Sequence, residues 1–232
     1  MKKHIPNIIT LLNLSSGVVA VLLASRGRLQ EAAVMVVAAS VFDFFDGFTA
    51  RLLHVKSNVG KELDSLADVV SFGVAPAVMM YFLLCKTNTN LFVFHEIFVL
   101  QAVIAILFPC FVALRLAKFN LDERQTSVFF GLPSPAAAFV LISLPFFPLF
   151  DCSFCLYTII ILLLCVLMLS DIQLFSLKFT NYKIKDNIFR YVLLCFALFL
   201  ILWLRAMSLP FIILAYIILS IVQNRLNIKK LG

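Results

Sequence analysis

Long apolar stretches, separated by short polar connections, recur along the whole chain. Each is close to the length of about 20 apolar residues that a helix needs to cross a bilayer. The pattern predicts eight membrane helices, over residues 7–25, 30–53, 62–85, 91–114, 133–150, 154–172, 188–204 and 208–224. We therefore expect an all-α integral membrane protein whose 232 residues form one helical bundle, with the last two helices at its periphery.

The composition agrees with a membrane protein and argues against a soluble one. Of the residues, 63% are hydrophobic and 13% are charged. Soluble domains contain about half apolar and about a quarter charged residues. The first apolar stretch lies where a signal peptide would, but no small-residue cleavage site follows it, so we expect a retained helix.

Basic residues concentrate in alternate connections and in both terminal segments. Fifteen lie on this side: Lys2, Lys3, Arg51, Lys56, Lys61, Arg115, Lys118, Arg124, Lys178, Lys183, Lys185, Arg190, Arg225, Lys229 and Lys230. The other connections hold four: Arg26, Arg28, Lys86 and Arg205. Connections rich in Lys and Arg stay in the cytoplasm, so both termini are expected there. The net charge of +7 is then mainly a signal for orientation, and nucleic-acid binding explains it poorly.

Cysteine and histidine give no sign of a metal site. Cys152 and Cys155 form a lone C-x-x-C motif without two further zinc ligands nearby. We expect them to be small apolar residues, or at most to form a local disulfide. His4, His54 and His95 are far apart in the sequence, so they do not form a recognisable metal-binding motif.

Four aspartates interrupt the second and third apolar stretches. Asp43 and Asp46 are spaced i,i+3, and Asp64 and Asp68 are spaced i,i+4, so each pair lies on one helix face. The short cytoplasmic connection between the stretches predicts an antiparallel hairpin, residues 42–73, in which the four carboxylates converge near the cytoplasmic face. A charged side chain inside a membrane costs at least ~2.5–3.5 kcal/mol, which indicates a function for this cluster.

Carboxylates held this close repel one another unless cations neutralise them. Oxygen ligands of this kind suit Mg²⁺ or Mn²⁺, which in turn bind phosphate groups. Two such ions about 3.5–4 Å apart can stabilise both oxygens of a phosphoryl displacement. Gly47, Ala50 and Gly60 are small enough for a bulky group to approach the backbone, and Arg51 offers a guanidinium donor to phosphate.

A structural role and a transport role for the aspartates are both less consistent with their pattern. Buried ion pairs would need basic partners within the helices, and these are few. An ion-coupled transporter also keeps acids inside the membrane, but it predicts acids dispersed along a pathway and helices broken near the midplane. Here the acids cluster at one membrane face in one hairpin.

The spacing D-x2-D-G-x2-A-R-x8-G-x3-D-x3-D, from Asp43 to Asp68, resembles the signature of the CDP-alcohol phosphatidyltransferase family. Further stretches resemble the integral-membrane branch of this family that makes phosphatidylserine. These are IPNIITLLNLSSG (5–17), GKELDSLADVVSFGVAPA (60–77), LRLAKFN (114–120), FFGLPSPAAA (129–138) and SDIQLFSLKF (170–179).

The resemblance implies transfer of a phosphatidyl group from CDP-diacylglycerol to the hydroxyl of L-serine, with release of CMP. It implies that two divalent cations, Mn²⁺ or Mg²⁺, are held by Asp43, Asp46, Asp64 and Asp68. Asp68 would also accept the proton of the attacking hydroxyl. The residues implied to bind CDP-diacylglycerol are Asn7, Thr10, Gly47, Ala50, Arg51, Ser57 and Gly60. A homodimer in the cell membrane, with its active site facing the cytoplasm, is expected from the family.

The acceptor site is predicted from three residues in the second half of the chain. Arg115 is the candidate for the serine carboxylate, and Asn120 and Ser134 are candidates for nearby polar contacts. Alternatively, Arg115 is an anchor at the membrane interface, and the other two are loop and cap residues. A related enzyme with glycerol-3-phosphate or inositol phosphate as acceptor remains open, because Arg115 and Lys118 together supply two basic groups. Lys118 also departs from the Arg that is frequent in this branch.

Overall fold

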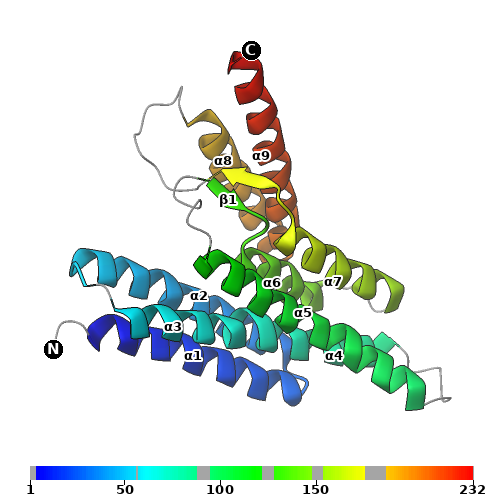
Figure 1. Cartoon of the computed structure of the whole chain (residues 1–232). Helices are drawn as coiled ribbons and strands as arrows, with labels where there is room; N and C mark the ends of the chain where they lie inside the picture. Colours follow the sequence, from blue (N-terminus) through cyan, green and yellow to red (C-terminus); the bar gives the residue numbers. More distant parts are fainter. Residues whose placement is uncertain are drawn as a thin grey trace.

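The computed structural model describes residues 4–55, 57–87, 95–121, 128–147, 154–175 and 187–231, which are almost entirely helical (Figure 1). The helices of the first half are α1 His4–Ser25, α2 Leu29–Leu52, α3 Asn58–Asp68, the π-helix η1 Val69–Val74, α4 Ala75–Thr87 and α5 His95–Leu121. Those of the second half are α6 Ser134–Ser143, the 3₁₀ helix η2 Leu144–Phe146, α7 Phe154–Leu169, α8 Ile188–Leu204, the 3₁₀ helix η5 Arg205–Ser208 and α9 Leu209–Leu231.

Helices α1 and α2 form a hairpin that packs along its whole length, with α3 beside it (Figure 1). The buried face of α1 consists of small or polar residues at helical spacing, among them Thr10, Asn13, Gly17, Ala20 and Ala24. Small residues let helix backbones approach closely, and polar residues can form hydrogen bonds between helices inside a membrane. This face is therefore suited to bring α1 close to both aspartate-bearing helices.

α3, η1 and α4 follow one another without a break, so Asp68 ends α3 directly before a π-helical turn. Ser57 begins this segment as an N-cap, because its Oγ accepts a hydrogen bond from the Gly60 N–H at 3.2 Å. π-Helical turns are rare in proteins as a whole, and those that occur are often found at functional sites.

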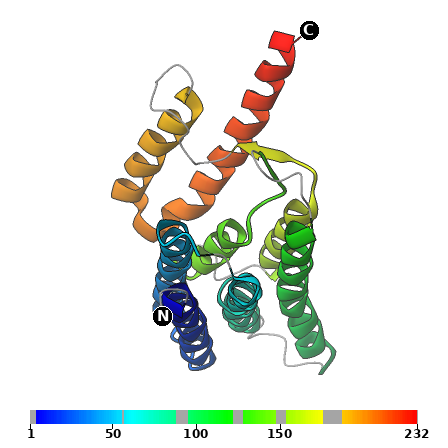
Figure 2. The same cartoon turned by 60° about the vertical axis from the view of Figure 1, so that its left-hand side comes forward.

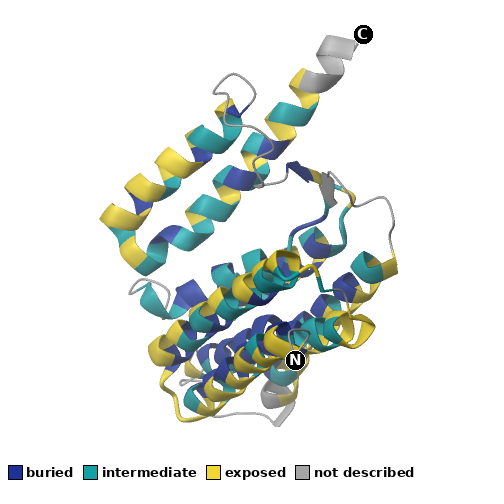
Figure 3. Ribbon diagram, turned by 90° about the vertical axis from the view of Figure 1, so that its left-hand side faces the viewer, coloured by how far each residue is buried: buried dark blue, intermediate teal, exposed yellow. Residues whose placement is uncertain are grey.

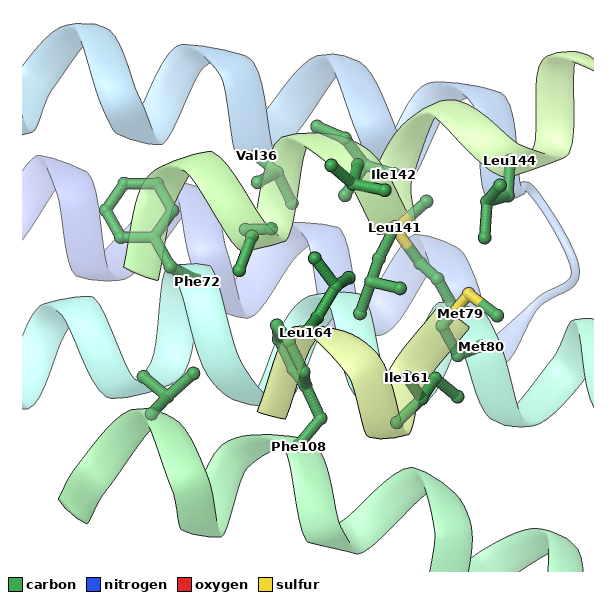
Figure 4. Packing of buried hydrophobic residues seen from close by; sticks show 14 of the residues in the cluster. Val36, Phe72, Met79, Met80, Phe108, Leu141, Ile142, Leu144, Ile161 and Leu164 are labelled. Carbon is green, nitrogen blue, oxygen red and sulfur yellow. The ribbon is translucent and has the colours of Figure 1, made fainter. Parts of the chain in front are cut away.

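The main hydrophobic core lies where α2, η1, α4, α5, α6 and α7 meet (Figure 4). Phe72, Phe108, Leu141 and Ile161 come from four of these elements, and each is almost fully buried. This core fixes the position of the helix that carries Asp64 and Asp68, because η1 and α4 are its continuation.

Five helical segments are long and apolar enough to cross a membrane: His4–Ser25, Leu29–Leu52, Asn58–Lys86, Val99–Leu121 and Ile188–Leu226. The last of these contains α8 and α9, which turn back on one another at η5 (Figure 3) and run at a steep angle to α1–α4 in Figure 1. The prediction of a helical membrane protein is thus supported, while the number of eight spans and the cytoplasmic termini stay predictions.

Two predicted membrane helices are shorter in the structure than expected. α6 has 10 residues and is extended by the three residues of η2, and α7 has 16 residues. At about 1.5 Å per residue these helices are roughly 20–24 Å long, below the ~30 Å of the hydrocarbon core. Neither meets the length of a full membrane helix within the described residues.

A small sheet also departs from the all-helical prediction. β1 Val128–Phe130 pairs antiparallel with β2 Gln173–Phe175 and precedes α6, while β2 follows α7 (Figure 2). Tyr216 of α9 donates its hydroxyl to the carbonyl oxygen of Phe175 at 2.8 Å. Asn224 donates to the carbonyl oxygen of Gln173 at 2.7 Å. These bonds attach α9 to the sheet.

Candidate active site

The predicted aspartate hairpin is present, and it brings three carboxylates into one cluster. Asp43 lies on α2, and Asp64 and Asp68 lie on α3. One oxygen from each of the three lies within 4.8 Å of the other two. In the described part of the chain, no second group of His, Cys, Asp or Glu side chains meets this spacing.

The cluster fits a divalent cation. The Oδ1 atom of Asp64 is buried and has no hydrogen-bond partner within the described residues, although a buried polar atom without a partner is unfavourable. In the same residues, the one ion pair within 4.0 Å joins Arg28 and Glu31, at the connection between α1 and α2. Converging carboxylate oxygens without a bound cationic side chain are the ligands that Mg²⁺, Mn²⁺ and Ca²⁺ prefer.

Asp46 occupies a different position from the other three aspartates. Its Oδ2 accepts a hydrogen bond of 2.6 Å from Thr10 Oγ1 on α1. The same hydroxyl lies 3.1 Å from the carbonyl oxygen of Pro6. It carries a single proton, so the shorter contact to the carboxylate is the stronger one. Asp46 is not part of the group within 4.8 Å, and it lies on the wall of the adjoining cavity with Asp64.

A cavity of about 380 Å³ adjoins the cluster, between α1, the end of α2 and the start of α3. Six of the seven residues predicted to bind CDP-diacylglycerol line it: Asn7, Thr10, Gly47, Ala50, Ser57 and Gly60. Lys61 lines it as well, and it contributes a positive charge. The cavity therefore combines small residues, hydroxyl and amide groups and one cation beside the carboxylates, which suits a polar, anionic ligand.

The two glycines of the cavity have different roles. A Cβ at Gly60 would lie 3.0 Å from Asn7 Oδ1 and 3.5 Å from Ser57 Cβ, so glycine leaves room for the Asn7 side chain of α1 against the start of α3. A Cβ at Gly47 would meet nothing closer than Arg51 Nη1 at 3.9 Å. Glycine at this second position keeps the cavity open.

Arg51 is the predicted substrate contact that the structure does not place in the cavity lining. Its side chain is exposed, at the last turn of α2 and one turn beyond Gly47. Helical spacing correctly predicts that Gly47 and Ala50 lie on the face of α2 that lines the cavity. A long side chain at a helix end, such as that of Arg51, can turn toward solvent instead. Its contact with a substrate stays a prediction.

Arg115 and Ser134, two of the three predicted acceptor residues, are in contact. Arg115 on α5 is 9% exposed and donates from Nη1 to Ser134 Oγ at 3.2 Å. Its guanidinium also lies over the ring of Phe119, 5.1 Å from the centroid. This cation is therefore buried against Ser134 and Phe119, and its positive charge is near enough to Asp68 for the two groups to attract each other.

Asn120, the third predicted acceptor residue, has different partners from Arg115 and Ser134, and its contact with the acceptor stays a prediction. Its side-chain amide donates to Ser65 Oγ at 2.8 Å, and its carbonyl oxygen accepts from Lys61 Nζ at 3.2 Å. Five residues along a helix correspond to a rotation of about 140°, so Asn120 and Arg115 lie on different faces of α5. Asn120 instead connects the end of α5 to α3.

Sequence reasoning missed two buried polar residues at the site, Asn13 and Ser71. Asn13 donates from Nδ2 to Asp68 Oδ1 at 3.3 Å, and Ser71 donates from Oγ to the carbonyl oxygen of Asn13 at 3.1 Å. A signal is present in the sequence, because Asn7, Thr10 and Asn13 repeat every three residues on one face of an apolar helix. Lys61 is a third missed residue, since the charge pattern marks it only as a signal for orientation.

The two cysteines of the C-x-x-C motif are only partly described. Cys155 is exposed and free on α7, while Cys152 lies outside the described residues. Lys118, the second basic residue considered for the acceptor site, is exposed.

Comparison with known proteins adds the family context. A family model described as CDP-alcohol phosphatidyltransferase matches residues 3–172, which is most of the chain. Similar curated proteins, each named CDP-diacylglycerol–serine O-phosphatidyltransferase, occur in Mycobacterium leprae, Bacillus subtilis and Methanocaldococcus jannaschii. They are 37% identical over 147 residues, 32% over 180 residues and 35% over 195 residues, respectively.

These matches differ in coverage. They cover 60%, 78% and 84% of this chain, in the same order. The chain spans about half of the Mycobacterium leprae protein, of which 46% is matched. It spans 92% of the Bacillus subtilis protein and 83% of the Methanocaldococcus jannaschii protein.

Proposed function

This chain belongs to the CDP-alcohol phosphatidyltransferase family, and from that premise we propose that it transfers a phosphatidyl group from CDP-diacylglycerol to L-serine. One observation carries the proposal. The carboxylate cluster of Asp43, Asp64 and Asp68 adjoins a cavity lined by six of the residues expected to hold the nucleotide. The relatives from three organisms, which carry the name of this activity, favour serine as the acceptor.

The donor substrate would bind with its CDP group in the cavity of about 380 Å³. Asn7, Thr10 and Ser57 offer hydrogen bonds to the nucleotide, and Lys61 offers a positive charge to phosphate. The four aspartates would hold divalent cations, which we propose to be two Mn²⁺ or Mg²⁺ ions. When bound, such ions neutralise the charge of the diphosphate and stabilise the departing CMP.

The acceptor would bind on the other side of the cluster, at Arg115 and Ser134. The guanidinium of Arg115 suits the serine carboxylate, because it presents a planar set of donors to two oxygens. Asp68 would accept the proton of the serine hydroxyl as the oxygen forms a bond to the phosphorus of the phosphatidyl group. The bond from that phosphorus to the oxygen of CMP breaks, so CMP leaves and phosphatidylserine remains.

The surroundings of Arg115 favour serine over an acceptor that carries a phosphate. A phosphate-bearing acceptor would need several basic groups directed into the site, and Lys118, the obvious second one, is exposed. Serine needs one cation for its carboxylate. We further propose that the site faces the cytoplasm, since Lys and Arg concentrate at this end of the chain's helices. A homodimer stays a prediction.

The purified protein in detergent tests the proposal directly. CMP release is measured with CDP-diacylglycerol, Mn²⁺ or Mg²⁺, and serine, glycerol-3-phosphate or inositol phosphate in parallel. Asp68→Asn is the test variant, and Asp171→Asn is the matched control, because Asp171 is exposed and outside the cluster. Release that depends on serine, and that is lost with EDTA and in Asp68→Asn alone, supports the proposal.

Two results would contradict parts of it. Turnover with another acceptor only would retain the metal site and reject serine. No metal-dependent release with any acceptor, in protein with a symmetric size-exclusion profile, would reject the enzyme and favour an ion-coupled transporter instead.

A further inference from the structure

Asn13 is a buried polar residue next to the proposed catalytic carboxylate, outside the predicted set of site residues. It is 0% exposed on α1, and its Nδ2 donates to Oδ1 of Asp68, itself 8% exposed, at 3.3 Å. The amide nitrogen faces the carboxylate because an amide oxygen in that place would repel it. Asn13 does not line the cavity of about 380 Å³, so it reaches the site through Asp68.

The position of Asn13 is itself fixed from the other side. Ser71, in η1, donates from Oγ to the main-chain carbonyl oxygen of Asn13 at 3.1 Å. One turn further along α1, Gly17 lies against the same residue, since a Cβ there would be 2.8 Å from Ser71 Cα. α1 therefore contacts the π-helical turn that immediately follows Asp68. Such turns often occur at functional sites.

The oxygen of the Asn13 amide gives evidence against a purely structural role. Its Oδ1 is buried and has no hydrogen-bond partner within the described residues. A half-satisfied amide in a helix bundle is less favourable than an apolar side chain of similar size. Packing alone would therefore favour leucine at this position, and the hydrogen bond to Asp68 is the feature that leucine would lose.

α1 makes equivalent contacts to both aspartate-bearing helices. Thr10 donates to Asp46 on α2, and Asn13, three residues later on the same face, donates to Asp68 on α3. Groups that hold metal ligands in orientation typically change metal affinity or activity by about 10- to 100-fold when removed.

We propose that Asn13 is a positioning residue for Asp68, which it holds by one oxygen so that the remaining lone pairs are directed to the metal and to the acceptor hydroxyl. The inference rests on the proposed function, in which Asp68 is both ligand and proton acceptor. Removal of Asn13 should lower kcat and metal affinity together and leave KM for CDP-diacylglycerol almost unchanged.

The test compares Asn13→Leu with Ser16→Ala in the full-length protein in detergent. Ser16 is buried on the same face of α1, but its hydroxyl bonds to the carbonyl oxygen of Leu12 within its own helix. Three quantities are measured: Mn²⁺ binding by electron paramagnetic resonance, the thermal unfolding temperature without metal, and kcat and KM with whichever acceptor is used. Asn13→Leu should weaken Mn²⁺ binding and lower kcat by about 10- to 100-fold each, without a lower unfolding temperature, and Ser16→Ala should change neither.

Several outcomes would overturn the inference. These are unchanged Mn²⁺ binding and kcat in folded Asn13→Leu, equal losses in Ser16→Ala, or a parent protein that binds no Mn²⁺. If the parent protein does not use serine but Asn13→Leu still weakens Mn²⁺ binding, the proposed acceptor fails and the role of Asn13 stands. If Asn13→Leu does not accumulate, Ser71→Ala decides in its place, and unchanged Mn²⁺ binding and kcat in that variant would overturn the inference.

Discussion

The first three helices and the last two are built from different kinds of side chain. Among the five long apolar segments, Asn58–Lys86, which begins with α3, is the most buried, and Ile188–Leu226, which contains α8 and α9, is the least buried. α1 buries Gly, Ala, Ser, Thr and Asn. α8 buries Leu193 and Leu200 and exposes Phe199, Leu202 and Trp203.

This difference shows where the sequence constrains the structure most. Small side chains on the buried face of α1 let its backbone pack close to the neighbouring helices. At that distance, Thr10 and Asn13 of α1 can form hydrogen bonds to the aspartates. Large apolar side chains on α8 face outward, as lipid-facing residues do, and many residues can replace one another there. The following predictions test this contrast.

The largest effect is expected for Asp68→Asn. Asparagine is nearly isosteric but cannot accept the hydroxyl proton, and a general base contributes about 10²–10⁴-fold to the rate. CMP release with serine should fall by that factor. Phe199→Ala, on the exposed face of α8, should retain the parent rate, and a comparable loss in that variant would remove the contrast between the two regions.

A smaller effect is expected for Arg115→Ala. Hydrogen bonds to charged groups are worth about 1.5–3 kcal/mol, so KM for serine should rise by about 10- to 100-fold. KM for CDP-diacylglycerol should stay near the parent value. The control is Lys118→Ala, three residues away and exposed. Equal losses in both variants would assign Arg115 to a general electrostatic effect rather than to the acceptor site.

Gly60→Ala and Gly47→Ala should separate packing from substrate binding. A methyl group at Gly60 lies 3.0 Å from Asn7 Oδ1 in the free protein, whereas at Gly47 the nearest atom is at 3.9 Å. Overpacking destabilises a protein by about 1–3 kcal/mol, so only Gly60→Ala should lower the unfolding temperature without substrate. Both should raise KM for CDP-diacylglycerol. An equal decrease of the unfolding temperature in both variants would contradict the tight contact between Gly60 and the Asn7 side chain.

The smallest effect is expected at the contact between α9 and the sheet. Tyr216→Phe removes the hydrogen bond to the Phe175 carbonyl oxygen, and such a bond contributes about 0.5–1.5 kcal/mol to stability. The unfolding temperature should fall slightly while CMP release per folded molecule stays the same. Trp203→Phe, at an exposed site, should change neither quantity. A specific loss of activity in Tyr216→Phe would give α9 a role in catalysis.

The aspartate hairpin and the cavity could be predicted because they depend on local spacing. The i,i+4 interval places Asp64 with Asp68, and the short connection between the helices brings Asp43 beside them. The i,i+3 interval did not predict that Asp46 would lie outside this group, bonded to Thr10. The same helical spacing predicts that Gly47, Ala50, Ser57 and Gly60 lie near the aspartates. Six of seven expected contacts accordingly line one cavity.

Contacts between distant segments could not be predicted in the same way. Helical spacing gives the face of Asn13 or Asn120 but not the helix that this face meets, and Asn120 binds Ser65 rather than joining Arg115. The side-chain direction of Arg51 at a helix end is likewise not set by the sequence spacing. The shortness of α6 and the pairing of β1 with β2 depend on packing between segments that are far apart in the chain.

The π-helical turn after Asp68 sets a rotation between two faces of one continuous helix. One residue added to or removed from an α-helix rotates everything beyond it by about 100°. Val69–Val74 thus lets the aspartate face of α3 and the core face of α4, with Met79 and Leu84, point in directions that an uninterrupted α-helix would not combine. A single-residue deletion in this turn at a position other than Ser71 would turn the carboxylates away from their partners while every side chain of the site remained in the sequence. The length of this segment is therefore as much a part of the active site as its chemistry.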